Sequence, residues 1–183
     1  TTSNHLNIGD AIRLDMATAL SESVYIGFES GLNDDLTANK CVGIGNEAMK
    51  TNTTQSGCVA IGYQALTLQS GINNTAIGHR ALSRTTATNA ANNVAIGYDT
   101  MLRATLGSHN TVVGYSAATA ITTGTFNTVL GSSAGGGLLT GSYNLCLGYA
   151  AGSGGSISGN DNIFIGTSAG RTTTTGSFNI ILA

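Results

Sequence analysis

One short phrase recurs along the whole chain: an aliphatic residue or Thr, a small residue, an aliphatic residue and then Gly, as in Val94-Ala95-Ile96-Gly97. Successive copies lie 16 to 19 residues apart. A near-constant period of this length is typical of solenoids, in which each repeat adds one coil to a stack. The marker glycines of the phrase are Gly9, Gly27, Gly45, Gly62, Gly78, Gly97, Gly114, Gly131, Gly148 and Gly166.

The phrase alternates with a period of two and is rich in β-branched residues, which predicts one short β-strand per repeat. We expect its two aliphatic columns to face the interior of the coil. The column before the marker glycine is Ile8, Ile26, Ile44, Ile61, Ile77, Ile96, Val113, Leu130, Leu147, Ile165 and Leu182. The column two positions earlier is Leu6, Val24, Val42, Val59, Thr75, Val94, Thr111, Thr128, Leu145, Ile163 and Ile180.

Two turns per repeat are expected to close each coil around two short strands. The marker glycine makes the first turn, and a second glycine, usually behind Ser or Thr, makes the other. The second glycines are Gly71, Gly107, Gly124, Gly141, Gly159 and Gly176. A column of alanines is expected to pack where space is short: Ala48, Ala65, Ala81, Ala117, Ala134, Ala151 and Ala169.

An asparagine stands directly before the strand in most repeats. Such a column either forms amide ladders between stacked coils or suits the junction of a turn and a strand, and the sequence leaves both open. Its members are Asn74, Asn93, Asn110, Asn127, Asn144, Asn162 and Asn179.

Composition supports a folded rod and argues against several classes of protein. The apolar fraction is 41% and the net charge is −2, so the chain has enough apolar surface to fold. Seven Lys and Arg against nine acidic residues argue against nucleic-acid binding. No apolar run approaches the roughly 20 residues that span a bilayer, and we expect no membrane contact.

Stacking at roughly 4.8 Å per coil predicts a rod about 50 Å long. Because a single narrow coil buries little surface, association of several chains is expected. The array stops at Ala183 inside a repeat, which predicts that the polypeptide is longer. Residues 1–40 are interpreted as divergent first coils or a boundary, and residues 41–183 as the regular array.

The segments Asn73-Asn74-Thr75-Ala76-Ile77-Gly78 and Asn92-Asn93-Val94-Ala95-Ile96-Gly97 resemble the head repeats of YadA-like trimeric autotransporter adhesins. Similar 17-residue repeats, with Ala60-Ile61-Gly62-Tyr63 and the residues after it, are found in tail-fibre proteins of phages and large viruses. The resemblance covers nearly the whole chain. It implies a left-handed parallel β-roll of about ten coils in which three identical chains associate.

No catalytic, metal or cofactor site is predicted, because the three histidines, His5, His79 and His109, are far apart and carboxylates are sparse after Glu47. The enzymatic alternative is the hexapeptide-repeat acyltransferase, which needs three aliphatic hexads per coil where this chain has one phrase. An ice-binding solenoid is a further alternative, suggested by Thr172 to Thr175.

Three cysteines lie in two kinds of column. Cys41 and Cys58 occupy one column in consecutive repeats, where a disulfide is geometrically possible, and Cys146 occupies a core column. Three packed thiols are the preferred interpretation. Two sequons, at Asn52 and Asn73, would permit glycosylation in a eukaryotic host.

Tyrosines follow several marker glycines and suggest a binding hypothesis, in which aromatic rings repeated along a rod stack on sugars. The alternative is that the rings shield the coil or fill seams between chains. The tyrosines are Tyr63, Tyr98, Tyr115 and Tyr149.

The sequence therefore predicts an extracellular structural protein, the shaft of a homotrimeric virion or phage tail fibre that supports host attachment. The competing prediction is a bacterial surface adhesin that binds glycan or matrix. On the first prediction, host glycans or proteins are bound by regions outside this chain.

Overall fold

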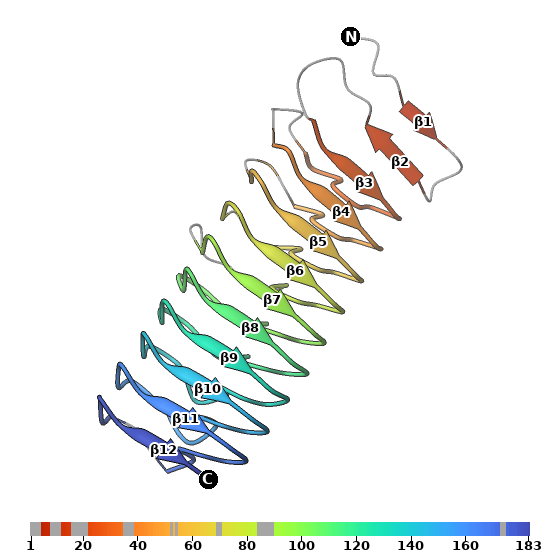
Figure 1. Ribbon diagram of the computed structural model, residues 1–183. Helices are drawn as coiled ribbons and strands as arrows, with labels where there is room; N and C mark the ends of the chain where they lie inside the picture. The colour runs from red at the N-terminus through yellow and green to blue at the C-terminus, as the bar shows by residue number, and fades with distance from the viewer. Residues whose placement is uncertain are drawn as a thin grey trace.

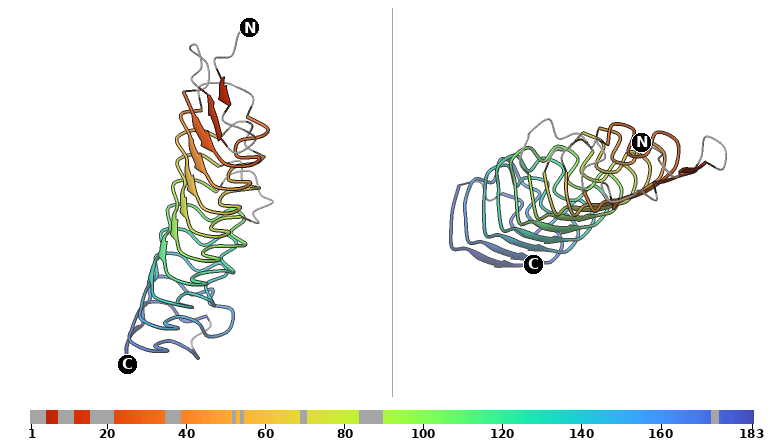
Figure 2. Two further views of the ribbon diagram at one scale, coloured as in Figure 1. Left: turned by 90° about the vertical axis from the view of Figure 1, so that its right-hand side faces the viewer. Right: turned by 90° about the horizontal axis from the view of Figure 1, so that it is seen from above.

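The computed structural model describes residues 22–34, 39–51, 53, 55–68, 71–83, 90–172 and 175–183, together with the backbone of residues 5–7 and 12–15. These residues form an all-β parallel solenoid and contain no helix. Its strands follow one another in a single sheet in chain order (Figure 1). Both views of Figure 2 show the strands along one side of the stacked coils. The predicted fold class, a β-solenoid repeat array, is confirmed.

Ten parallel strands make the rod. Each is three residues long and coincides with one copy of the repeated phrase. Neighbouring strands pair in phase, for example Thr75 with Val94 and Ile77 with Ile96. The strands are β3 (Val24–Ile26), β4 (Val42–Ile44), β5 (Val59–Ile61), β6 (Thr75–Ile77), β7 (Val94–Ile96), β8 (Thr111–Val113), β9 (Thr128–Leu130), β10 (Leu145–Leu147), β11 (Ile163–Ile165) and β12 (Ile180–Leu182).

The first two strands are an exception. β1 (His5–Asn7) pairs antiparallel with β2 (Ile12–Asp15), and β2 pairs antiparallel with β3. Leu6, in the first copy of the phrase, therefore lies in an antiparallel pair at the start of the sheet and not in a parallel strand. Ile8 and Gly9, which belong to the same predicted copy, lie outside the described residues.

The strands bury the opposite face from the one that the sequence predicted. In β6, β7 and β11 the middle residue is buried and the two flanking residues are only half-buried. The same holds along the array: the middle residues of the other strands from β3 to β10 are also buried, whereas Leu130 is 49% exposed. The expectation that the two aliphatic columns face inward is wrong, because the small central residue faces the narrow interior and the aliphatic residues face out.

The interior is filled by complementary pairs, one member in mid-strand and the other six residues later. Small mid-strand residues such as Ala76 are paired with a large buried residue such as Leu82. Where the mid-strand residue is an aromatic ring, as at Phe164, the partner is Gly170, whose Cβ, if present, would lie 2.3 Å from the ring. Each coil has a similar space to fill, so a larger residue on one side requires a smaller one on the other. The pairs are Tyr25/Gly31, Gly43/Met49, Ala60/Leu66, Ala76/Leu82, Ala95/Met101, Val112/Ala118, Val129/Gly135, Cys146/Gly152 and Phe164/Gly170.

The marker glycines turn the chain away from the sheet. Gly78 has a φ of +130°, and a Cβ there would lie 2.3 Å from the carbonyl oxygen of Gly97 in the next coil. Both the positive φ and the close approach of the coils exclude larger side chains. The alanine column that follows is buried, as predicted, in all seven positions.

In the described residues, the far side of the coil holds no second strand. Among the described residues it contributes one isolated bridge, between Leu138 and Ile157. Successive coils are joined there by single backbone hydrogen bonds, such as Leu82 N–H to Thr100 O at 3.0 Å. Several of the donor residues, such as Leu82 with a φ of 50°, have left-handed backbone angles, and a strand cannot continue through them. The prediction of two strands per coil is wrong for this reason.

The asparagine column forms a buried amide ladder. The side-chain oxygen of Asn93 accepts hydrogen bonds from the backbone and side-chain N–H groups of Asn110, at 2.9 and 3.2 Å. The Asn110 amide also donates to Gly124 O in the second turn, at 2.9 Å. The same pattern runs from Asn74 to Asn179. The ladder interpretation is confirmed.

Candidate functional site

The largest candidate site is the outer face of the parallel sheet. It consists of the two flanking columns of β3 to β12, which hold 17 aliphatic residues and three threonines and no charge. At about 4.8 Å per strand and 3.3 Å per residue, this face measures roughly 45 by 10 Å. Parallel sheets almost always have both faces covered. Here no described segment of the chain covers the outer one (Figure 2).

Exposure varies along this face. Val24, Ile61 and Leu147 are 36 to 38% exposed, and Leu130 is 49% exposed. These values leave a continuous apolar band from one end of the rod to the other. Contiguous apolar bands of several hundred Å² mark interaction surfaces on soluble proteins.

The tyrosine column borders this face at the marker-glycine corner. The rings of Tyr63, His79 and Tyr98 stack with centroids 4.9 and 4.8 Å apart, and Tyr115 continues the stack 5.3 Å beyond Tyr98. His79 stands in the same column of the sequence, and the structure places it between two tyrosines. The guanidinium of Arg80 lies 5.7 Å from the Tyr98 ring centre.

This stacking limits what the tyrosine ladder can bind. Because neighbouring rings lie nearly parallel, at 10° and 11° on the two sides of Tyr98, they cover one another's faces and present their edges. A sugar stacks on a ring face rather than on an edge. Tyr115 and Tyr149 differ, because the intervening coil has Ser132 in the column, and these two rings are 58% and 59% exposed.

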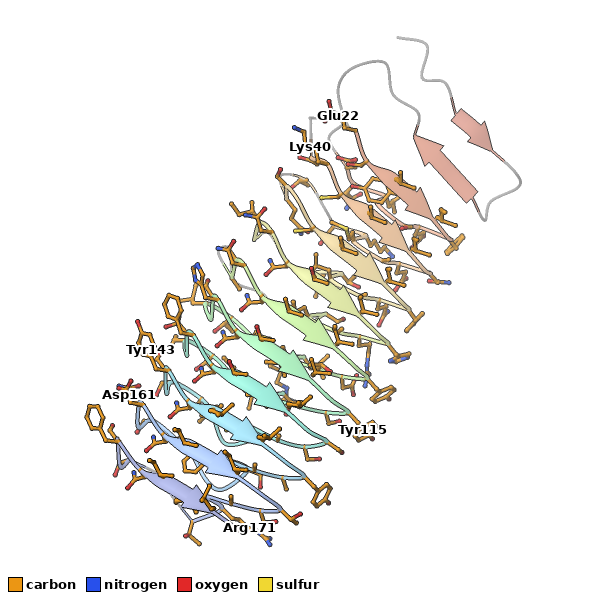
Figure 3. All side chains as sticks on the ribbon, viewed as in Figure 1. Glu22, Lys40, Tyr115, Tyr143, Asp161 and Arg171 are labelled. Carbon is orange, nitrogen blue, oxygen red and sulfur yellow. The ribbon has the colours of Figure 1, made fainter. Side chains whose placement is uncertain are left out.

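A second aromatic ladder borders the opposite corner, just before the asparagine column. His109, Phe126 and Tyr143 stack with centroids 4.7 and 5.0 Å apart. Figure 3 shows Tyr143 and Tyr115 at opposite corners of the sheet. The sequence analysis missed this ladder because its column is mixed. The repeated position alone could have revealed it: Asn73, Asn92, His109, Phe126, Tyr143, Asp161 and Phe178.

Charged groups pair across coils near the first corner. Lys50 lies 2.5 Å from Glu29 and 3.1 Å from Glu47, and these carboxylates raise the pKa of the Lys50 amine. A hydrogen bond from the Gln64 amide lowers the pKa of Glu47, and a hydrogen bond from Lys50 lowers it further. Arg80 Nε donates to Asp99 at 2.7 Å, and this carboxylate raises the pKa of the guanidinium. The Lys50–Glu29 and Arg80–Asp99 pairs link successive coils, whereas Lys50 and Glu47 lie in the same coil.

The cysteines are buried free thiols, as predicted. Cys41 and Cys58 extend the asparagine ladder toward the N-terminus: Asn74 N–H donates to Cys58 Sγ and Cys58 N–H to Cys41 Sγ, both at 3.4 Å. The hydrogen bond with Cys41 and burial raise the pKa of Cys58. Burial raises the pKa of Cys146 to about 12. Such thiols are poor nucleophiles at neutral pH.

The part of the chain that the structure describes brings no three His, Cys, Asp or Glu side chains together in a metal-binding group. It also holds no helix with the length and hydropathy needed to cross a bilayer. The side chain of His5, the sequon residue Asn52 and two of the threonines between Thr172 and Thr175 fall outside the described residues.

Comparison of the chain with protein-family models, with curated proteins and with solved structures gave no match.

Proposed function

We propose that this chain is the shaft of a homotrimeric fibre, exposed on a virion or phage tail, that supports host attachment. The uncovered outer face of the parallel sheet is the observation that carries the proposal. Three rods related by a threefold axis would bring their apolar bands together and cover them. This arrangement is also the one that the resemblance to YadA-like head repeats implies.

Stiffness is the mechanical property that the coil supplies. Strand pairing joins every coil to the next, the asparagine ladder adds side-chain bonds, and the aromatic ladders add contacts at two corners. Each coil contacts mainly its two neighbours, so the rod extends by repetition without a change of cross-section. A spacer with these properties places an attachment domain at a fixed distance from its base.

The proposal assigns no reaction, cofactor or metal to this chain, and it places host recognition in regions outside it. It also makes the apolar band a contact between copies of the chain. The two aromatic ladders then lie along the edges of that contact.

Light scattering of the purified chain, combined with electron microscopy, tests the proposal. We expect a mass three times the 18.4 kDa of one chain and particles with the length of one rod. A monomer that remains monomeric at high protein concentration would contradict it.

Glycan binding is the second candidate function, and one observation favours it. Tyr115 and Tyr149 each have a ring face free beside Ser132, where one sugar ring could insert. A glycan array should then give a signal that Tyr115→Ala or Tyr149→Ala abolishes, while Tyr98→Ala, a change within the stacked ladder, preserves it. A signal unaffected by both of the first two substitutions would contradict this candidate.

A further inference from the structure

The second aromatic ladder has a gap of one coil. Tyr143, Asp161 and Phe178 occupy equivalent positions in three successive coils, with φ values of 59°, 56° and 61°. Their backbone N–H groups donate to equivalent carbonyls of the preceding coils, those of Thr125, Ser142 and Asn160, at 3.0 to 3.1 Å. Asp161 therefore stands where the ladder would otherwise have a ring, and Figure 3 shows it beside Tyr143 at the same corner.

The size of the gap follows from the ladder itself. Phe126 and Tyr143 are one coil apart, with centroids separated by 5.0 Å and ring planes inclined by 4°. Tyr143 and Phe178 lie two coils apart, with one coil between them. We therefore expect their rings to be about 10 Å apart, twice the interstrand repeat. A group midway between them lies about 5 Å from each ring centre, within the roughly 6 Å over which a cation is attracted to an aromatic face.

The gap is open and negatively charged. Tyr143 is 57% exposed, and Asp161 is exposed in the next coil. Within the described part of the chain, Asp161 forms no salt bridge, in contrast to Asp99, which pairs with Arg80. Two ring faces and an unneutralised carboxylate form the three sides of a site for an organic cation, in which the rings attract the charge and the carboxylate balances it.

The first ladder contains a natural control. Tyr115, Ser132 and Tyr149 reproduce the same one-coil gap at the opposite corner, with a neutral hydroxyl in place of the carboxylate. The two gaps have the same spacing and differ in charge. Selectivity for a cation is therefore expected at Asp161 alone.

We propose that Tyr143, Asp161 and Phe178 bind a trimethylammonium group. This compact cation matches the space between the two rings, and its charge is spread over methyl groups that contact aromatic faces well. The inference goes beyond the fibre role and does not rest on it.

Titration of the full chain with choline, followed by NMR of the Tyr143 and Phe178 rings, tests the proposal. The neutral isostere 3,3-dimethylbutanol is the matched ligand. Choline is expected to bind at least about threefold more tightly than the isostere, and added salt is expected to weaken choline binding alone. Equal binding of the two ligands would overturn the proposal.

Three variants sharpen the test. Asp161→Asn keeps the shape of the site and should remove the preference for choline, whereas Asp161→Tyr completes the ladder and should abolish binding while the chain stays folded. Ser132→Asp should create a second choline site between Tyr115 and Tyr149. Unchanged choline binding in Asp161→Tyr would place the ligand elsewhere and overturn the proposal.

If choline binds, phosphocholine and vesicles of phosphatidylcholine distinguish a soluble ligand from a lipid headgroup. Binding of free phosphocholine with no binding to vesicles would assign the site to soluble or glycan-linked choline. Cosedimentation of the chain with vesicles, if Asp161→Asn abolishes it, would assign the site to a lipid headgroup. A chain that is trimeric but does not bind choline would overturn this site and leave the fibre proposal intact.

Discussion

The two faces of the same three-residue strands differ in what buries them. The inner column, with Ala76, Ala95 and Val112, is fully buried by the chain's own coil. The outer columns, with Ile77, Ile96 and Val113 beside them, are more apolar and are covered by nothing in the described part of the chain. Most inner residues are small because the coil is narrow, and the outer residues are larger and apolar, as the proposed association of chains requires. The inner column builds the coil, and in the proposed trimer the outer columns would form the contact between chains.

A charge on either side of one strand should separate these two roles and have the largest effect. Ala95→Asp places a carboxylate in the coil interior with no partner, and we expect a loss of more than about 4 kcal/mol in the free energy of unfolding. Ile96→Asp is the matched change one residue away on the outer face. It should dissociate the proposed trimer while the β-sheet signal in circular dichroism persists.

Thermal unfolding and light scattering on both variants check this prediction. If Ala95→Asp remained folded while Ile96→Asp unfolded the isolated coil, the two faces would be assigned the wrong way round.

An exchange of volume across the coil should have the next largest effect. Ala76→Phe overfills the interior and Leu82→Gly empties it, and each alone should cost about 2–4 kcal/mol. Together they recreate the arrangement of Phe164 and Gly170. The double variant should recover about 2 kcal/mol relative to the sum of the single changes, measured by a double-mutant cycle in denaturant. Strict additivity would contradict the pairing of these positions.

The asparagine ladder offers a smaller test of the inner side. Asn110→Ala removes bonds to Asn93, Gly124 and Asn127 and should cost about 2–3 kcal/mol. Asn110→Cys should cost less, because Cys58 already fills the equivalent position and its sulfur accepts the Asn74 N–H. Equal losses in the two variants would show that the sulfur does not replace the amide.

The smallest effect concerns Cys146, whose pKa burial raises to about 12. The thiol ionises more easily in the unfolded chain, so the folded state should lose about 1 kcal/mol of stability between pH 9 and pH 10. Cys146→Ala should flatten this part of the stability profile, and an unchanged slope in that variant would assign the effect to another group.

The sequence predicted the repeat, the strand positions and the asparagine ladder because each is a periodic property. It assigned the wrong face inward because hydrophobicity alone does not distinguish burial within a chain from burial between chains. In the proposed trimer Ile77 and Ile96 are apolar for the second reason, and the small size of Ala76 and Ala95 indicates which side of the strand is narrow. The second strand was predicted from two turns per repeat, but positive φ at residues such as Leu82 is not apparent from the residue type.

The candidate site was predictable in part. The tyrosine column was found from its place after the marker glycine, but stacking across coils, which hides the ring faces, depends on the distance between coils. The ladder of His109, Phe126 and Tyr143 was missed because its column also holds asparagines and Asp161. Mixed columns give no signal in composition, although the fold places them in one line.

Labelling of a cysteine at Thr111 tests the outer-face assignment most directly. Thr111 is exposed on the outer face of β8, and the native thiols are buried, so Thr111→Cys supplies the reactive thiol. Thr123→Cys, on an exposed turn, is the control. The account predicts that a maleimide labels Thr123→Cys rapidly and Thr111→Cys only after the chains are dissociated. Equal, rapid labelling of both variants in the native protein would contradict it.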